Sequence, residues 1–395
     1  MCQRTPDPIR QPPRPECAAF RAMPWYAAIL GLVVLGCQSC RPPSDEVLHP
    51  TPENVPVDPS LIVADSLPRD LSAGALQRWR DARDNLLGAP ARLWIGSNQD
   101  GPGLFGRVRG VSIDDADNII VLDDQASEIR VFASDGGHLQ TLGGFGDGPG
   151  ELRGATSIQS LPHGRLLVLG RPRRGKLFER TPSGYRVVRP LEVMVDAPDT
   201  ACSSDPAHVF VAGGTGAQRS AVHRVSVESG ELVSHVGIGY VFDDWAVRGM
   251  IATGTVGCLD GVATQPVVFH ASELLPFVRA YRASDGLLLW AARLEHFKQT
   301  RLVTPHDGGI VVWSDHARDR VSSVQPLPPV HLIVQTSRFA PFGRDPSSVN
   351  TYLVDAETGS GALISDDLGH LLAVTMDRYI VLGNDPFPQL EIRDR

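Results

Sequence analysis

The sequence lacks several features that would define a function at once. It contains no Gly-x-Ser-x-Gly elbow, His-Glu-x-x-His helix, Walker loop or dinucleotide-binding fingerprint. Aromatic residues make up only 6% of the chain, and 37 Lys and Arg against 45 Asp and Glu give a formal net charge of −8. Nucleic acid is therefore not expected as a partner, because binding phosphates requires a basic surface.

The apolar run at residues 25–36 is too short for a membrane-spanning helix, which needs roughly 20 residues. Its length favours a secretory signal peptide. The run ends in Val34-Leu35-Gly36-Cys37, which resembles the lipobox of bacterial lipoproteins. That resemblance implies a signal peptide over residues 1–36, cleavage before Cys37 and acylation of the Cys37 thiol. The alternative is a short anchor followed by a chance cysteine, and translation could begin at Met1 or Met23.

Few cysteines lie in the part of the chain that is expected to fold. Of the six, only Cys202 and Cys258 lie beyond residue 60, and they form no C-x-x-C pair there. On neighbouring strands in an oxidising compartment they could form a disulfide. Two ordinary buried cysteines are the alternative, because free cysteine packs as a small apolar side chain.

Residues 37–59 are rich in proline and acidic residues and predict a flexible tether. Residues 60–90 predict a strand at 60–64 and a capping helix that ends near Gly88 and Pro90. The apolar face of that helix is made of Leu71, Leu76, Trp79, Ala82 and Leu86. Its opposite face mixes Arg and Asp, whereas a membrane-surface helix would be more uniformly basic. We therefore expect the helix to pack on the domain that follows.

Short strands separated by Asp, Asn, Ser and Gly fill the next stretch. Gly-Pro-Gly occurs at 101–103 and again at 148–150, with four strand-like runs between the two copies. A recurrence of about 40–50 residues that holds four strands is typical of a β-propeller blade. Residues 91–395 are therefore predicted to form an all-β propeller.

Both ends of this region are incomplete as blades. Residues 91–96 form a lone strand, whereas 371–375, 378–382 and 390–393 are three strands that end the chain. We expect the N-terminal strand to pair with the C-terminal blade, because ring closure removes exposed sheet edges. Five further blades are counted from their hairpin glycines, which gives six in all. These glycines are Gly136, Gly184, Gly230, Gly286 and Gly359.

The spacing between Gly286 and Gly359 exceeds one repeat. The surplus falls at residues 296–320 and predicts an extra hairpin between the fourth and fifth blades. A degenerate seventh blade is the competing count.

The segment Gly146-Asp147-Gly148-Pro149-Gly150-Glu151 and the strands of 111–132 resemble the bacterial six-bladed, NHL-repeat-like propellers of the TolB-like group. The resemblance covers residues 91–395 as architecture and is sharp over the first two blades. It implies a six-bladed fold, often found in lipoproteins. Ala126 and Glu128 replace the Asn and Arg of NHL repeats, so the RNA- or peptide-binding roles of some NHL domains do not transfer. A fold alone does not define a function.

Loops between the second and third strands, and loops between blades, emerge on one face of a propeller, where functional sites usually lie. Mixed charge and aromatic residues gather there by this register and suit a polar ligand, a glycan or a peptide. A solvated rim with aromatic side chains beneath the loops is the alternative. The candidate ligand-binding residues are Asp123, Asp124, Arg171, Arg173, Arg174, Tyr240, Trp245, Arg248, His296, Arg338 and Asp385.

These patterns predict a monomeric, lipid-anchored, non-catalytic module that binds a peptide, a glycan or an envelope protein and needs no cofactor. Its expected place is the outer side of the cytoplasmic membrane or the outer membrane. The alternative is a metal-dependent hydrolase of the lactonase or esterase kind, or a lyase, with acidic groups around a cation at the axis. It ranks second because Asp114 and Asp123 are the only carboxylates at repeated positions.

Overall fold

The computed structural model describes residues 46–48, 58–215, 220–237, 239–240, 245–262, 265–304, 311–313, 316–343, 346–384 and 386–395. All of them belong to the compact unit Pro43–Arg395. The predicted signal peptide and Cys37 lie outside these ranges. Among the described residues, no helix has the length and apolar character needed to cross a bilayer.

The described strands form four-stranded antiparallel repeats. Four of the repeats are separate sheets, and two more are joined in one nine-stranded sheet. The first three repeats are β4 (Val108–Ile113), β5 (Ile119–Asp123), β6 (Glu128–Phe132) and β7 (His138–Gly143); β8 (Ala155–Leu161), β9 (Arg165–Gly170), β10 (Arg174–Thr181) and β11 (Gly184–Glu192); and β12 (Ala201–Cys202), β13 (His208–Ala212), β14 (Val222–Ser226) and β15 (Leu232–Val236). The others are β16 (Gly254–Val262), β17 (Gln265–Ser272), β18 (Phe277–Arg282) and β19 (Leu288–Leu294); β22 (Arg318–Leu327), β23 (His331–Phe339), β24 (Pro346–Asp355) and β25 (Gly361–Ser365); and β26 (His370–Val374), β27 (Arg378–Gly383), β28 (Gln389–Asp394) and β3 (Ala91–Ile95).

Within a repeat, burial changes from strand to strand. Every residue of β5 is buried, because β5 is a central strand covered on both faces by neighbouring sheets. Most of β7, the last strand of the same repeat, is exposed or half-buried. This gradient explains why second strands are continuous apolar runs and fourth strands alternate with polar residues.

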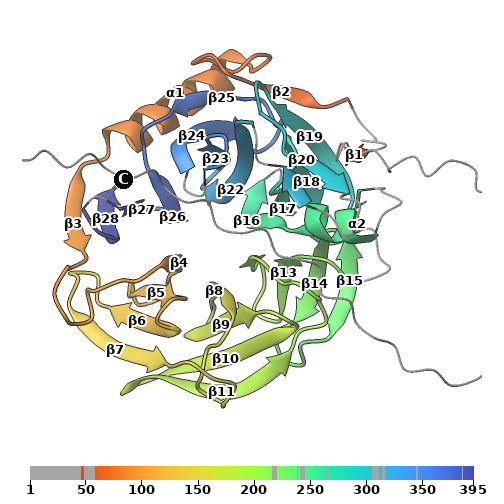
Figure 1. Cartoon of the computed structure of the whole chain (residues 1–395). Helices are drawn as coiled ribbons and strands as arrows, with labels where there is room; N and C mark the ends of the chain where they lie inside the picture. Colours follow the sequence, from red (N-terminus) through yellow and green to blue (C-terminus); the bar gives the residue numbers. More distant parts are fainter. Residues whose placement is uncertain are drawn as a thin grey trace, which may run out of the picture. The chain divides into compact units, whose positions relative to one another are not determined.

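The repeats follow one another around a common axis (Figure 1). The first strand of each repeat is called here the inner strand. Each inner strand contacts the next in the closed order β4, β8, β12, β16, β22, β26 and back to β4. The fold is therefore all-β and propeller-like.

The two ends of the described domain meet in one sheet. β3 pairs antiparallel with β28, with Leu93 opposite Ile392 and Trp94 opposite Glu391. The prediction that residues 91–96 complete the C-terminal sheet is confirmed. Ile95 and Ile392 share a buried cluster with Val111 and Val121 of the first repeat, so the closing sheet also packs on its neighbour.

The hairpin glycines adopt the backbone conformation that the turns require. All five predicted turn glycines have φ between +72° and +113°. At Gly230 a Cβ atom would lie 2.3 Å from the carbonyl oxygen of Glu192 on the preceding repeat. Glycine is needed at this turn both for its positive φ and for this close approach.

β2 (Ser60–Val63) lies where the sequence predicts a strand, but its partners were not foreseen. It is parallel to both β19 and β25 and joins the two repeats into the nine-stranded sheet. The Ser60 hydroxyl donates to the carbonyl oxygen of Gly359 at 3.1 Å. β2 thereby covers two outer sheet edges that would otherwise be open to pairing with another chain.

The predicted helix is α1 (Ala73–Gly88), which begins after the N-cap Ser72. The Ser72 side chain accepts a hydrogen bond from the Ala75 amide. Trp79 is fully buried and its indole nitrogen donates to the carbonyl oxygen of Leu353 at 2.9 Å. The buried face of α1 packs on the repeats β22–β25 and β26–β3. The expectation of a packing helix is therefore met.

The extra hairpin is formed by β20 (Arg301–Thr304) and β21 (Val311–Trp313). It lies between β19 and β22 in the sequence, but β16 contacts β22 directly, so the hairpin contributes nothing to the ring of inner strands. β20 also pairs with β1 (Glu46–Leu48). The segment 37–59, which the sequence predicts to be a flexible tether, thus contains a short strand. Its proline- and acid-rich composition gives no sign of a partner so distant in sequence.

Adjacent leucines of α1 provide a matched test of this packing. Leu86 is 1% exposed and Leu87 is 41% exposed. We expect Leu86→Ala to lower the free energy of unfolding by about 2–5 kcal/mol, because it removes buried methyl groups and leaves a cavity. Leu87→Ala should change it by less than ~1 kcal/mol. Denaturant titration measures both, and equal effects would contradict the packing of α1.

Candidate functional site

The inner strands surround a central channel with a volume of about 510 Å³. Small residues of four inner strands line it, namely Ser112, Thr156, Ser322 and Ala373. None of the described lining residues is Phe, Tyr or Trp. Small side chains at these positions keep the axis open.

The inner strands belong to different repeats and do not pair with one another. Small polar side chains instead connect their backbones. The Thr156 hydroxyl donates to the carbonyl oxygen of Pro198 at 2.9 Å, and the Val256 amide donates to the Thr200 hydroxyl at 2.9 Å. These contacts hold adjacent inner strands in place around the channel.

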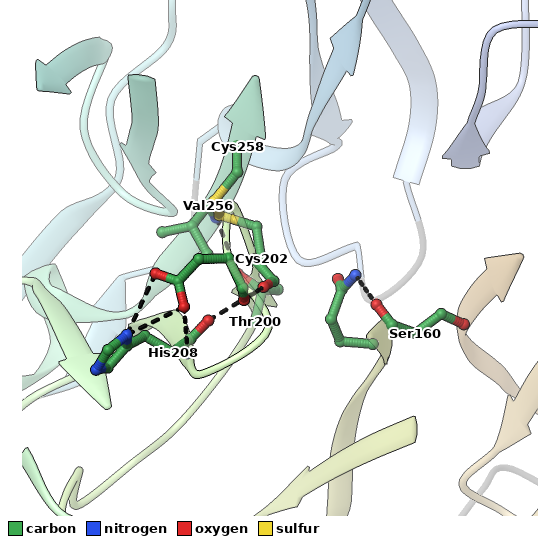
Figure 2. Close-up of a disulfide and its surroundings, with 9 residues drawn as sticks. Ser160, Thr200, Cys202, His208, Val256 and Cys258 are labelled. Carbon is green, nitrogen blue, oxygen red and sulfur yellow. Dashed lines mark hydrogen bonds and ion pairs between the residues drawn. A yellow bond between two sulfur atoms is a disulfide. The ribbon is translucent and has the colours of Figure 1, made fainter. Parts of the chain in front are cut away.

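A disulfide joins two inner strands. It connects Cys202 on β12 with Cys258 on β16, so of the two alternatives for these cysteines the structure has the pair (Figure 2). Both cysteines line the channel. β12 has only two residues and is the shortest inner strand, so the covalent bond holds a strand that backbone pairing alone would hold weakly.

Two arginines meet one carboxylate at an end of the channel. Asp199, which is 9% exposed, accepts from Arg109 at 3.4 Å and from Arg171 at 3.2 Å. Burial raises the pKa of Asp199, and the two guanidiniums oppose that rise. Arg109 also donates to the carbonyl oxygen of Thr156 at 3.3 Å, which fixes its stem on the second repeat.

A second ion pair lies beside the first. Arg320 donates to Glu273 at 2.8 Å, and Glu273 is close enough to raise the pKa of Asp199 further. His370 lines the channel, and burial together with Arg109 lowers its pKa to about 4, so its imidazole is neutral at pH 7. These six residues, Arg109, Arg171, Asp199, Glu273, Arg320 and His370, are called here the channel mouth.

Asp123 does not belong to a ligand-binding surface. Its side chain is fully buried and accepts from the amides of Gly106 at 2.7 Å and Arg107 at 3.0 Å. Its oxygens hold the loop that leads into the first repeat, so Asp123 presents no side-chain surface to a ligand in this structure. Asp124 remains accessible in part and pairs with Arg107 at 2.6 Å.

The basic side chains of residues 171–176 contact different parts of the structure. Only Arg171 reaches the channel mouth. Arg173 donates to Asp196 on the loop that leads to the third repeat, at 2.6 Å. Arg174 pairs with Asp147 on the loop that leads from the first repeat. The run therefore neutralises acidic loops on both sides and does not form one basic patch.

The remaining predicted residues are scattered. Tyr240 is 3% exposed and lies under Arg279, whose guanidinium is 4.2 Å from its ring centroid. Trp245 begins α2 (Trp245–Ala252) and Arg248 lies on the same helix. His296 is an exposed turn residue with φ +57°. None of these joins the channel mouth through a described contact.

Arg338 is committed to one partner. Its Nε and Nη2 atoms donate to the buried carboxylate of Asp319 at 2.7 and 2.8 Å, and Asp319 also accepts from the Lys298 amide at 2.8 Å. This bidentate pair raises the pKa of Arg338. Asp385, the last of the predicted site residues, lies outside the described residues.

Sequence reasoning missed Arg109, Asp199, Glu273, Arg320 and His370. A signal existed for Arg109, because it stands near the start of an inner strand that is otherwise apolar or small. Arg320 follows Arg318 and Asp319 at the start of β22 and does not stand out in this way. Asp199 and Glu273 lie in loops, and the packing of one repeat on the next brings them to arginines of other repeats.

Comparison with known proteins supports the fold. No family model matches the sequence, and no curated protein matches it. A solved Bacteroides fragilis protein whose name describes it as exported is similar over 85% of this chain and 98% of its own, with a TM-score of 0.55 and 11% identity. A Bacteroides vulgatus member of the DUF4221 family is similar over 78% of this chain and 97% of its own, with a TM-score of 0.52 and 10% identity. At such identities the likeness shows the fold alone.

Removal of the disulfide should weaken the ring. We expect the double variant Cys202→Ala, Cys258→Ala to lose about 2–5 kcal/mol of unfolding free energy, because the bond closes a long loop and holds the short β12. Chemical denaturation measures the loss. Dithiothreitol should lower the stability of the unmodified protein to the same degree and leave the variant unchanged; a variant as stable as the parent would contradict this role.

Proposed function

We propose that this protein is a lipid-anchored, non-catalytic binding module of the cell envelope, built as a six-bladed, NHL-like propeller. Its ligand binds at the channel mouth. The observation that carries the proposal is a channel of about 510 Å³ lined by Arg109 and His370, beside which Arg171 and Arg320 from other repeats form ion pairs with Asp199 and Glu273. Such a concave site on a rigid scaffold, with a few placed polar groups, is typical of ligand binding.

The blade count rests on the inner strands. Their contacts close after β26, and β3 supplies the outer strand that the C-terminal repeat lacks. The hairpin β20–β21 is excluded from the count because it supplies no inner strand.

The place in the cell rests on two features of the sequence and structure. The segment before Cys37 resembles a lipobox. The Cys202–Cys258 disulfide fits the oxidising compartments in which such bonds persist. A bacterial envelope offers both a lipid anchor and these redox conditions.

The metal-dependent hydrolase or lyase stays the second candidate and gains no specific support. It requires several acidic or imidazole groups that converge on a cation. Within the part of the chain that the structure describes, no three His, Cys, Asp or Glu side chains are grouped in this way. The mouth carboxylates Asp199 and Glu273 both pair with arginines.

Substitution of the acylated cysteine tests the anchor. We expect Cys37→Ala to move the protein from the membrane fraction to the soluble fraction, because no diacyl chain would hold it. Cys40→Ala, three residues further along, is the matched control and should stay with the membrane. Immunoblots of fractionated cells measure both, and membrane retention of Cys37→Ala would contradict lipid anchoring at this residue.

Narrowing the channel tests the binding site. A panel of neutral saccharides, acidic saccharides and short peptides is screened by thermal shift, since a ligand that binds only the folded state raises the Tm. We expect Thr255→Leu, on the channel wall, to weaken the best ligand by about tenfold or more, a loss of at least ~1.4 kcal/mol. Val233→Leu on the exposed side of β15 should leave binding unchanged. If Thr255→Leu binds the ligand as tightly as the parent protein, the binding site does not lie in the channel.

A further inference from the structure

The charges of the channel mouth do not balance. Three guanidiniums, of Arg109, Arg171 and Arg320, face two carboxylates, of Asp199 and Glu273, and the neutral His370 adds none. The mouth therefore carries one net positive charge in a chain whose formal net charge is −8. A local charge opposite to that of the whole protein attracts an anion toward this opening.

Arg109 and Arg171 have hydrogen-bonding capacity to spare. A guanidinium carries five N–H donors. The described contacts use two donors of Arg109 and one of Arg171, and two of these bonds are shared on the single oxygen Asp199 Oδ1 at 3.2–3.4 Å. The side chains are 44% and 45% exposed. Asp199 thus holds both guanidinium groups in place, while their remaining N–H groups stay open to solvent.

A further arginine strengthens the field. Arg318 lies two residues before Arg320 on β22, and both guanidiniums are 5.3 Å from the ring centroid of Phe339. Arg318 is only 6% exposed, and its Nη2 atom donates to the carbonyl oxygen of Gly343 at 3.0 Å. Among the described residues it pairs with no carboxylate, so its charge adds to the positive potential beside the Arg320–Glu273 pair.

The channel wall below the mouth offers neutral polar groups. Ser112, Gln159 and Gln325 line the channel. Hydroxyl and amide side chains can both donate and accept hydrogen bonds, so this wall suits the hydroxyl or amide groups of a polar ligand that reaches past the arginines.

We propose that the ligand is a small, polar carboxylate whose anionic group binds between Arg109 and Arg171 and whose hydroxyl or amide groups enter the channel. This inference rests on the proposed function and names its ligand class. Asp199 Oδ1 already accepts from the same two guanidiniums, so the two arginines converge on one carboxylate oxygen. A sugar acid and the C-terminus of a short peptide are two sources of this chemistry.

Isothermal titration of the full-length protein in detergent tests the proposal with two pairs of probes. D-Galacturonate is compared with its methyl ester, and N-acetyl-dialanine with its C-terminal amide. We expect the acid of at least one pair to bind about tenfold or more tightly than its neutral partner, since hydrogen bonds to charged groups contribute that much. Its affinity should fall as salt rises. The pair that responds identifies the source.

Charge-altering variants supply the decisive comparison. Arg109→Gln and Arg171→Gln should each weaken the binding of the acid about 10–100-fold. Arg186→Gln is the control and should leave the affinity unchanged, because Arg186 is an exposed arginine on the outer strand of the second repeat, where it pairs with Glu179. Asp199→Asn should increase the affinity for the acid several-fold, because it removes the internal carboxylate that competes for the two arginines. A merely structural arginine cluster would not give this gain.

The outcomes separate this inference from the proposed function. If the neutral probes bind as tightly as the acids and Thr255→Leu abolishes binding, the proposal of a carboxylate ligand is refuted, whereas the proposed binding site in the channel is supported. Acid binding that Asp199→Asn weakens would overturn the placement between the two arginines. Displacement by millimolar sulfate with no preference for either organic acid would show a general anion site and also overturn the proposal.

Discussion

The pairing of β3 with β28 is the contact on which the rest of the domain depends. Each repeat is a thin antiparallel sheet with one face against the preceding repeat and one against the next, so no repeat is complete alone. If the last sheet lacked its outer strand, the first and last repeats would present open faces and edges to solvent. The pairing of Leu93 and Trp94 with Ile392 and Glu391 of the C-terminal strand covers one of those open edges, and the buried cluster around Ile95 and Ile392 extends this contact into the first repeat.

Closure also creates the candidate site. Inner strands held around an axis cannot pair with one another, so their backbones are joined by hydroxyl groups such as those of Thr156 and Thr200 and, between β12 and β16, by a disulfide. The arrangement of the repeats around the axis also brings Asp199 close to Arg109 and Arg171, which lie in other repeats. The ion pairs of the mouth thus depend on the packing of successive repeats, because no single repeat contains them.

Much of the fold could be predicted because short stretches of the sequence determine it. Apolar second strands, hairpin glycines at positive φ and the unmatched strand at 91–96 each depend on a few adjacent residues. The parallel insertion of β2 and its fusion of two repeats could not be predicted, because a four-residue strand carries no information about which edge it joins. The site was harder still. The run 171–176 resembles a basic patch in sequence, but Arg173 and Arg174 turn to opposite neighbours, and Asp123 proved to be a buried brace.

A cross-strand disulfide tests ring closure most directly. Trp94 and Glu391 are direct partners in the β3–β28 register, so Trp94→Cys with Glu391→Cys should oxidise spontaneously in the folded protein. Peptide mass spectrometry after proteolysis should find the 94–391 link, and the linked protein should keep or raise its Tm. The pair Trp94→Cys with Val233→Cys, on the exposed side of β15, should not link. Failure of the first pair to link, or unfolding when it does, would contradict a domain closed by its N-terminal strand.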